Sequence, residues 1–463
     1  MSQFDKALGA AAQAAETFAE SLGSRAVWPR ATYDEMLKRL GVVLQADPMA
    51  PEDVVAELAE LAEPGLSATG SGRFFGYVIG GAQPAALAAD WLTSTWDQNA
   101  ALVGVSPAAS AVEMVAARWL LDLLDLPRES SVGFVTGATM ANFTCLAAAR
   151  HQILARAGFD VERIGLAGCP QIRVLVGADR HDSVDLAVRY LGLGADAVQL
   201  VSSDDEGRIE VDALRRKLAE SSAPTIVCLQ AGEVHTGAFD PFEPAIQAAH
   251  QAGAWVHVDG AFGLWARAGQ TTRWLTAGLE AADSWCTDCH KTLNVPYDSG
   301  LAIVRSSAAH HAAFAVRSDY LMTGSTPEPL DVVPEISRRA RGFAVWAALR
   351  ALGRRGVAEL VDRLHSHARR MAAGIAQIED AEVLNDVVFT QVMASFADPE
   401  VSAEVGRRIL ASGAAVVTAA SWRGRAVQRI SVSNWATTEA DVDATVEAMA
   451  GVAARLARPA GRL

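Results

Sequence analysis

The chain has 463 residues, 51% hydrophobic and 20% charged, so it is long enough for two or three domains and too apolar to be disordered. Its 40 basic and 54 acidic residues give a formal net charge of −14, which argues against nucleic acid or an anionic membrane as a main partner. It has no secretory signal pattern and no apolar run of membrane-spanning length, and five scattered cysteines are typical of reduced thiols, so we expect a cytoplasmic location.

The predicted elements divide the chain into three parts. Residues 1–75 alternate amphipathic helical patterns with turn signals, which predicts an N-terminal helical segment. Residues 76–315 contain seven short apolar runs separated by helical patterns, and residues 316–463 combine a long helical pattern with strand-like stretches. Continuous apolar runs indicate strands buried on both faces. We therefore predict a large α/β domain with a mostly parallel seven-stranded sheet and helices on both faces, followed by a small α+β domain.

Small residues follow the first predicted strand in the stretch TGATMAN, residues 136–142. A turn of this kind before a helix presents unpaired backbone N–H groups and the positive end of the helix dipole, which suits a phosphate. The hydroxyl of Thr139 adds a possible donor. Glycine and threonine are also common in strand-to-helix turns, so this stretch alone is a weak signal.

Three polar residues follow later strands of the same predicted sheet. His181 comes just after the second strand, where its ring either stacks on a flat ligand or caps the next helix. Asp259 ends an apolar strand, and its carboxylate either pairs with a ligand or caps the next helix. Lys291 follows the next strand and is one of only four lysines among the 40 basic residues. Unlike arginine, lysine can lose its proton and form an imine, although a lysine reaching solvent from a strand end is the simpler alternative.

Together these groups point to one cofactor. A phosphate-binding turn, a ring that can stack, a buried carboxylate and a lysine amine are the groups that hold pyridoxal 5′-phosphate (PLP). The lysine forms the Schiff base, and the carboxylate keeps the pyridine nitrogen protonated. We predict no metal site, because the CxxC at Cys286 and Cys289 lacks a second pair of ligands.

The sequence also resembles the PLP-dependent group II decarboxylases, which include aromatic amino acid and glutamate decarboxylases. TGATMAN, the HDSV segment, HVDGAFG, DCHK and PEISRRARGFAVWAALR occur in the order expected for that family. The resemblance implies fold type I, and a homodimer with its active sites at the interface. It implies that Lys291 is the Schiff-base lysine and Asp259 the pyridinium partner. The other implied contacts are His181 and Ala261 on the two faces of the ring, Ala138, Thr139 and His290 at the phosphate, and Tyr77 on the substrate side.

Two segments depart from the family pattern. The turn that usually contains consecutive threonines reads AGEVHTGAFD here, with Glu233, Val234 and His235. The segment LMTGSTPEPLDVVPEISRR lacks the tyrosine that protonates the substrate carbanion in the family. A substitute proton donor is then needed; His181, His235 and water are the candidates, and we favour His235, which lies in the altered turn. Relatives that perform retro-aldol cleavage contact a phosphate with a Gly-Ser element. The stretch TGS at 323–325, which ends in Ser325, resembles this element.

We expect an amino-acid decarboxylase, with an aldolase acting on a β-hydroxy amino acid, an aminotransferase and a non-catalytic cofactor-binding protein as alternatives. The particular amino acid stays open. Tyr77, Trp96, Asn99 and the aromatic run 262–265 either line a pocket for an aromatic side chain or belong to the core. Arg338 or Arg339 is expected to bind a substrate carboxylate with two hydrogen bonds.

Overall fold

The computed structural model describes residues 3–316 and 328–457, so Ser325 and part of the loop before Arg338 lie outside the described residues. The chain forms two compact units. The first consists of Met1–Ile79, Arg370–Leu384 and Met393–Leu463, and the second of Gly80–Arg369 and Asn385–Val392. In the part of the chain that is described, no helix has both the length and the apolar character needed to cross a bilayer.

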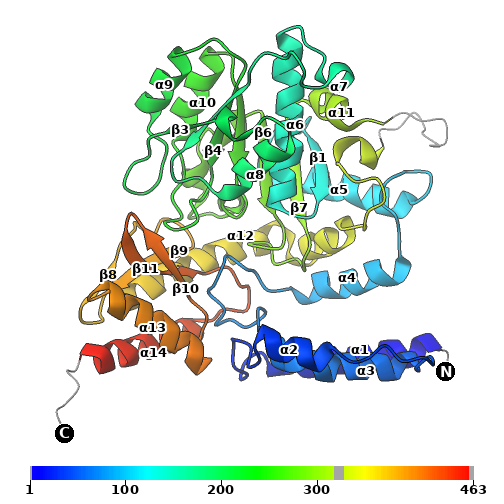
Figure 1. Ribbon diagram of the computed structural model, residues 1–463, viewed down its shortest axis with the longest axis vertical. Helices are drawn as coiled ribbons and strands as arrows, with labels where there is room; N and C mark the ends of the chain where they lie inside the picture. The colour runs from blue at the N-terminus through cyan, green and yellow to red at the C-terminus, as the bar shows by residue number, and fades with distance from the viewer. Residues whose placement is uncertain (1–2, 317–327, 458–463) are drawn as a thin grey trace. The chain divides into compact units, whose positions relative to one another are not determined.

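The second unit is built on a seven-stranded sheet in the order β1-β7-β6-β5-β4-β2-β3 (Figure 1). Strand β7 runs antiparallel to β1 and β6, and the other neighbouring pairs are parallel. This arrangement confirms the predicted, mostly parallel sheet. The strands are β1 (Ser131–Val135), β2 (Arg173–Gly177), β3 (Val198–Val201), β4 (Thr225–Gln230), β5 (Trp255–Asp259), β6 (Ser284–Asp288) and β7 (Gly300–Val304).

Every residue of β2, β4, β5, β6 and β7 is buried, as expected for a sheet that is covered by helices on both faces. Helix α6 packs on β5, β6 and β7 (Figure 1), while α10 packs on β5 and α9. The helices that begin in this unit are α4 (Pro84–Trp96), α5 (Pro107–Leu123), α6 (Ala138–Arg156), α7 (Val161–Ile164), α8 (Asp182–Tyr190), α9 (Val211–Ala219), α10 (Phe242–Gln251), α11 (Ser307–Phe314) and α12 (Gly342–Ile375). Helix α12 is interrupted at Gly353, where φ is 61°.

The first unit joins the N-terminal helices to the C-terminal α+β part. Val27 and Phe74 pack with Val416 in one buried cluster, and the N–H of Phe75 donates to the carbonyl of Val416 at 2.9 Å. A four-stranded sheet in the order β10-β11-β9-β8 lies in the C-terminal part. The elements are α1 (Gln3–Ser21), α2 (Tyr33–Leu40), α3 (Pro51–Ala62), β8 (Ala381–Val383), β9 (Gln391–Phe396), α13 (Pro399–Ser412), β10 (Thr418–Trp422), β11 (Arg425–Ser431) and α14 (Glu439–Ala457).

Candidate active site

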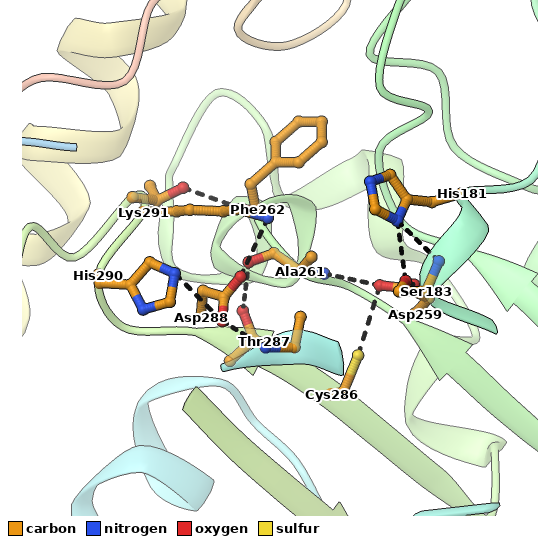
Figure 2. Close-up of polar contacts among 12 residues, drawn as sticks. His181, Ser183, Asp259, Ala261, Phe262, Cys286, Thr287, Asp288, His290 and Lys291 are labelled. Atoms are coloured by element: carbon orange, nitrogen blue, oxygen red, sulfur yellow. Dashed lines mark hydrogen bonds and ion pairs between the residues drawn. The ribbon is translucent and has the colours of Figure 1, made fainter. Parts of the chain in front are cut away.

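The candidate residues follow the carboxyl ends of neighbouring strands in the second unit. Asp259 is the last residue of β5, and Lys291 comes three residues after the end of β6. His181 follows β2, which is separated from β5 only by β4. Figure 2 shows these side chains near one another, close to the ends of the strands. Ligands of open α/β sheets bind at the carboxyl ends of the strands, because loops and helix N-termini meet there.

Polar groups surround the carboxylate of Asp259, whose residue is 6% exposed. Its Oδ2 accepts from Asn142 Nδ2 at 3.0 Å and lies 3.4 Å from Ser183 Oγ. Its Oδ1 accepts from the N–H of Ala261 at 3.1 Å and lies 3.4 Å from Cys286 Sγ (Figure 2). Asp259 therefore caps the following turn with one oxygen and is bound from α6 and α8 at the other.

These surroundings keep Asp259 ionised. Burial by itself raises the pKa of its carboxyl, but His181 and the Asn142 amide act in the opposite direction, with help from His257 and Lys291. The net pKa lies below the ordinary value of an aspartate. A buried carboxylate that stays charged is suited to pair with a protonated ring nitrogen.

His181 caps helix α8 and also presents its ring. Its Nδ1 accepts the backbone N–H of Ser183 at 3.1 Å and lies 2.9 Å from Ser183 Oγ. The neutral ring therefore carries its proton on Nε2. Because the residue is exposed, helix capping and stacking on a ligand are compatible at this position.

Lys291 is paired with an aspartate that the sequence analysis did not single out. Its Nζ lies 3.0 Å from Asp288 Oδ2, and the side chains are 20% and 3% exposed. The other oxygen of Asp288 accepts the backbone N–H of Ala138 at 2.6 Å. The backbone at Gly80 also passes close by, since a Cβ there would collide with the carbonyl oxygen of Lys291. Asp288 thus links the lysine to the start of α6.

The start of α6 differs in one respect from what the sequence suggested. We expected the N–H of Ala138 to bind a phosphate, but it donates to Asp288, because a buried carboxylate takes the nearest donor. Thr139 is exposed in the same first turn, where further N–H groups have no partner within the helix. A Cβ at Gly137 would lie 3.1 Å from Cε1 of His290, so the turn and this histidine are close.

His290 is neutral and directs a donor towards the same region. Its Nδ1 accepts the N–H of Ser299 at 3.2 Å, which leaves the proton on Nε2, 3.6 Å from Asp288 Oδ1. Burial lowers the pKa of His290. The ring of Tyr297 stacks on it with centroids 4.2 Å apart.

His235 lies in the altered turn after β4 and is bound to Glu233. The Oε1 of Glu233 is 2.9 Å from His235 Nδ1, while Oε2 accepts the backbone N–H groups of His235 and Thr236 at 2.6 and 2.7 Å. Glu233 is 2% exposed. Because the carboxylate accepts, Nδ1 of His235 carries a proton.

The expected substrate residues have other partners in the structure. Both η nitrogens of Arg338 bind Glu113, at 2.6 and 2.7 Å, because a buried guanidinium needs a carboxylate. Glu113 thus occupies the side of the Arg338 guanidinium that we expected to bind a substrate carboxylate. Arg339 pairs with Asp90 at 2.7 Å. Asn99 Oδ1 accepts the N–H of Arg338 at 3.3 Å. Tyr77 belongs to the first unit, is 57% exposed, and its N–H donates to Thr418 Oγ1 at 3.2 Å.

The aromatic run 262–265 belongs to the core. Phe262 is 3% exposed and stacks on Phe389, with ring centroids 6.1 Å apart. Trp265 is fully buried, and its indole N–H donates to the carbonyl of Asp288 at 3.0 Å. These residues therefore do not line an aromatic substrate pocket. Trp96 is 48% exposed and contacts Phe343 edge to face.

Three residues of the site were not predicted from the sequence, although their positions relative to predicted site residues could have indicated them. Asn142 lies one helical turn beyond Ala138, on the same face of α6. His257 precedes Asp259 by two positions and so faces the same side of β5. Asp288 stands in the DCHK tetrad itself.

The residues present fit PLP. The ionised, buried carboxylate of Asp259 suits the ring nitrogen, and the accessible amine of Lys291 suits the aldehyde. The exposed imidazole of His181 suits the face of the ring. The start of α6, beside the Nε2–H of neutral His290, suits the phosphate. Fold and site together define a PLP-dependent enzyme of fold type I.

Residues 34–396 match the model of the pyridoxal-dependent decarboxylase conserved domain, and the chain belongs to this family. It is 26% identical over 353 residues to aromatic-L-amino-acid decarboxylase of Bacillus atrophaeus, covering 73% of this chain and 71% of the relative. It is 30% identical over 339 residues to L-2,4-diaminobutyrate decarboxylase of Rhizobium meliloti (strain 1021), covering 69% and 65%. The crystal structure of Oryza sativa TDC with PLP and tryptamine has the same fold, with TM-score 0.92, 21% identity and 98% of both chains covered.

Family membership and these relatives settle the class of reaction. The chain is a PLP-dependent amino-acid decarboxylase, a carboxy-lyase. The retro-aldol and aminotransferase alternatives are not favoured, and the predicted cofactor is confirmed.

Proposed function

We propose that Lys291 binds PLP covalently, that Asp259 pairs with the ring nitrogen, and that the enzyme removes the α-carboxylate of a free amino acid as carbon dioxide. The observation that carries this proposal is the buried carboxylate of Asp259 at the end of β5, bound by Asn142 Nδ2 at 3.0 Å and by the N–H of Ala261 at 3.1 Å, with Lys291 just after the end of the neighbouring strand β6. When bound, PLP withdraws electrons from the bond to the departing carboxylate. The protein supplies the fixed charges and donors around it.

The remaining cofactor contacts follow from the same edge of the sheet. His181 presents its exposed ring to one face of the cofactor, and Ala261 leaves space at the other. Thr139 and the Nε2–H of His290 donate to the phosphate beside Ala138. Asp288 holds the ammonium of Lys291, at 3.0 Å, before the cofactor enters.

The proton that replaces the carboxylate needs a donor, and we propose His235. The turn that carries it follows β4, the strand between those that position Asp259 and His181. Glu233 keeps Nδ1 of His235 protonated and stabilises the imidazolium, so that Nε2 delivers a proton to the substrate Cα and later regains one from water. This arrangement takes the place of the tyrosine that the family carries on its loop.

The substrate is a free amino acid, and a direct screen identifies its side chain. Relatives named for aromatic amino acids, 2,4-diaminobutyrate and cysteine sulfinic acid give three chemical classes to compare. The holoenzyme is incubated with aromatic, cationic and acidic amino acids, and mass spectrometry scores amine, aldehyde and keto acid separately. Amine together with released carbon dioxide from one class supports the proposal. Keto acid without carbon dioxide from every substrate contradicts it.

We also propose that two copies of the chain form the active dimer. Helices α2 and α3 are amphipathic but bury none of their residues. Large apolar side chains stay exposed around them, and a helix of this length is stabilised mainly by packing its apolar face. These exposed side chains include Phe4 (74%), Leu37 (58%), Val43 (90%), Leu44 (90%) and Leu58 (58%). A reducing, cytoplasmic location agrees with the five free cysteines of the described residues.

A further inference from the structure

A chain of buried hydrogen bonds runs from the core of the sheet to Asp259. The indole N–H of Trp255 donates to Ser284 Oγ at 2.9 Å, and this oxygen lies 3.0 Å from His257 Nδ1. His257 Nε2 is 2.7 Å from Asn142 Oδ1, and Asn142 Nδ2 donates to Asp259 Oδ2 at 3.0 Å. Asn142, His257 and Ser284 have no exposed surface.

One arrangement of protons satisfies every contact in this chain. The amide of Asn142 directs Nδ2 towards two acceptors, since a reversed amide would place its oxygen against the carboxylate of Asp259. Its Oδ1 can only accept, so His257 must donate through Nε2. The Nδ1 of His257 then accepts the proton of Ser284, whose oxygen already receives the N–H of Trp255.

The charge state of His257 agrees with this arrangement. Burial lowers the pKa of His257 to about 4, so the ring is neutral near pH 7 and has a single N–H. The thiol of Cys286 lies 3.1 Å from Asn142 Oδ1 and supplies a second donor to the same oxygen. The orientation of the Asn142 amide is therefore determined by its neighbours on β5 and β6.

The chain branches at Asn142 and reaches both groups expected to hold the cofactor ring. The second N–H of Asn142 Nδ2 donates to Ser183 Oγ at 3.1 Å. That hydroxyl lies 2.9 Å from His181 Nδ1. One amide thus binds Asp259 directly and His181 through a single serine.

We infer that His257 and Asn142 are positioning residues for the cofactor: His257 fixes the direction of the Asn142 amide, which holds Asp259 and, through Ser183, His181 in place. This inference rests on the proposed pairing of Asp259 with the ring nitrogen. Without the N–H of His257, the amide can turn and present its oxygen to Asp259. The carboxylate then favours its protonated form and pairs less well with a pyridinium.

The test follows the ring nitrogen itself, in holoenzyme loaded with ¹⁵N-labelled PLP. In His257→Phe we expect the ¹⁵N signal to move from the pyridinium towards the pyridine position, and cofactor binding to weaken about tenfold or more, as for a lost hydrogen bond to a charged group. His257→Gln should restore both, because its amide N–H replaces Nε2–H. His310→Phe is the matched control, because His310 is also fully buried and bonded to a serine, Ser131, at 2.7 Å.

Two further measurements separate the possible failures. Asp259→Asn must move the ring nitrogen signal, and if it does not, the proposed role of Asp259 fails. If Asp259→Asn moves the signal but His257→Phe resembles His310→Phe, only the inference about His257 fails. Should His257→Phe not fold, ¹⁵N-histidine spectra of the wild type decide: the inference requires a neutral His257 protonated on Nε2, and the opposite tautomer overturns it.

Discussion

Lys291 Nζ lies 3.0 Å from Asp288 Oδ2, and the other oxygen of the same carboxylate accepts the N–H of Ala138 at 2.6 Å. One buried acid therefore joins the lysine proposed to bind the cofactor to the first turn of α6. Because Asp288 is 3% exposed at its side chain, the pair is little screened by water. The lysine is held next to the turn proposed for the phosphate before any cofactor enters.

The first prediction concerns Lys291→Arg. Arginine keeps the charge opposite Asp288 but cannot form an imine, so we expect loss of both the visible absorbance and decarboxylation. Borohydride reduction of the wild type followed by peptide mapping should place the pyridoxyl group on Lys291. Lys217→Arg is the control, because Lys217 pairs with Glu220 at 3.1 Å on the surface. A pyridoxyl label on Lys217 would remove the basis of the assignment.

The second prediction concerns Asp259→Asn. The amide still fits beside Ala261 but cannot hold a pyridinium, so we expect kcat to fall by about 10² or more, on the scale of one lost electrostatic partner. Asp240→Asn is the matched control, since Asp240 is buried and accepts two backbone N–H groups, from Ile209 and Gln230, both at 2.7 Å. Steady-state kinetics and the cofactor spectrum measure the effect. Near-normal turnover in Asp259→Asn would show that this residue only caps the turn and does not pair with the ring nitrogen.

The third prediction concerns His235→Phe. If His235 returns the proton to Cα, its loss should lower kcat by about 10²-fold and shift products from amine towards aldehyde, with the cofactor absorbance of the resting enzyme unchanged. Glu233→Gln should produce a weaker form of the same shift, because it removes the charge that supports the imidazolium. His250→Phe is the control, since His250 on α10 also pairs with a carboxylate, that of Asp283, at 3.0 Å. Unchanged rate and products in His235→Phe would assign the proton to another donor.

The fourth prediction concerns the dimer. Leu44→Asp places a charge at a side chain that is 90% exposed in the single chain. If this surface packs on a second copy, burial of the charge is costly, and sedimentation should show a monomer with little activity. Trp274→Asp is the control: it removes an aromatic side chain that is 68% exposed in the other unit, and it should leave the dimer intact. A wild-type monomer at working concentrations contradicts the proposal.

The fifth prediction concerns acid stability. Burial lowers the pKa of His310 to about 3 and that of His257 to about 4, whereas an unfolded histidine titrates near 6.5. Between these values the unfolded chain binds more protons, so the free energy of unfolding falls as the pH falls from about 6.5 towards 4. In His310→Phe this dependence should be shallower by about 1.4 kcal/mol per pH unit near pH 5. Urea unfolding across this range measures it, and an unchanged slope would show that His310 is protonated in the folded state.

Much of the fold and part of the site could be predicted from the sequence, because the relevant signals are local. Apolar runs without alternation mark strands covered on both faces, and seven such runs form the observed sheet. A residue at the end of a parallel strand lies at the same edge as its counterparts, so Asp259 and Lys291 were expected together. The scarcity of lysine singled out Lys291 without any structure.

The partners of these residues were decided only by the tertiary structure. Asp288 binds a residue 150 positions away, and Asp259 binds one 117 positions away. Arg338 is paired with Glu113 rather than available to a substrate, and Trp265 is core. A sequence pattern reports which face of an element is apolar, over a few residues. Which polar group meets a buried charge depends on packing between distant elements, because the low-dielectric interior requires each buried charge to find a partner there.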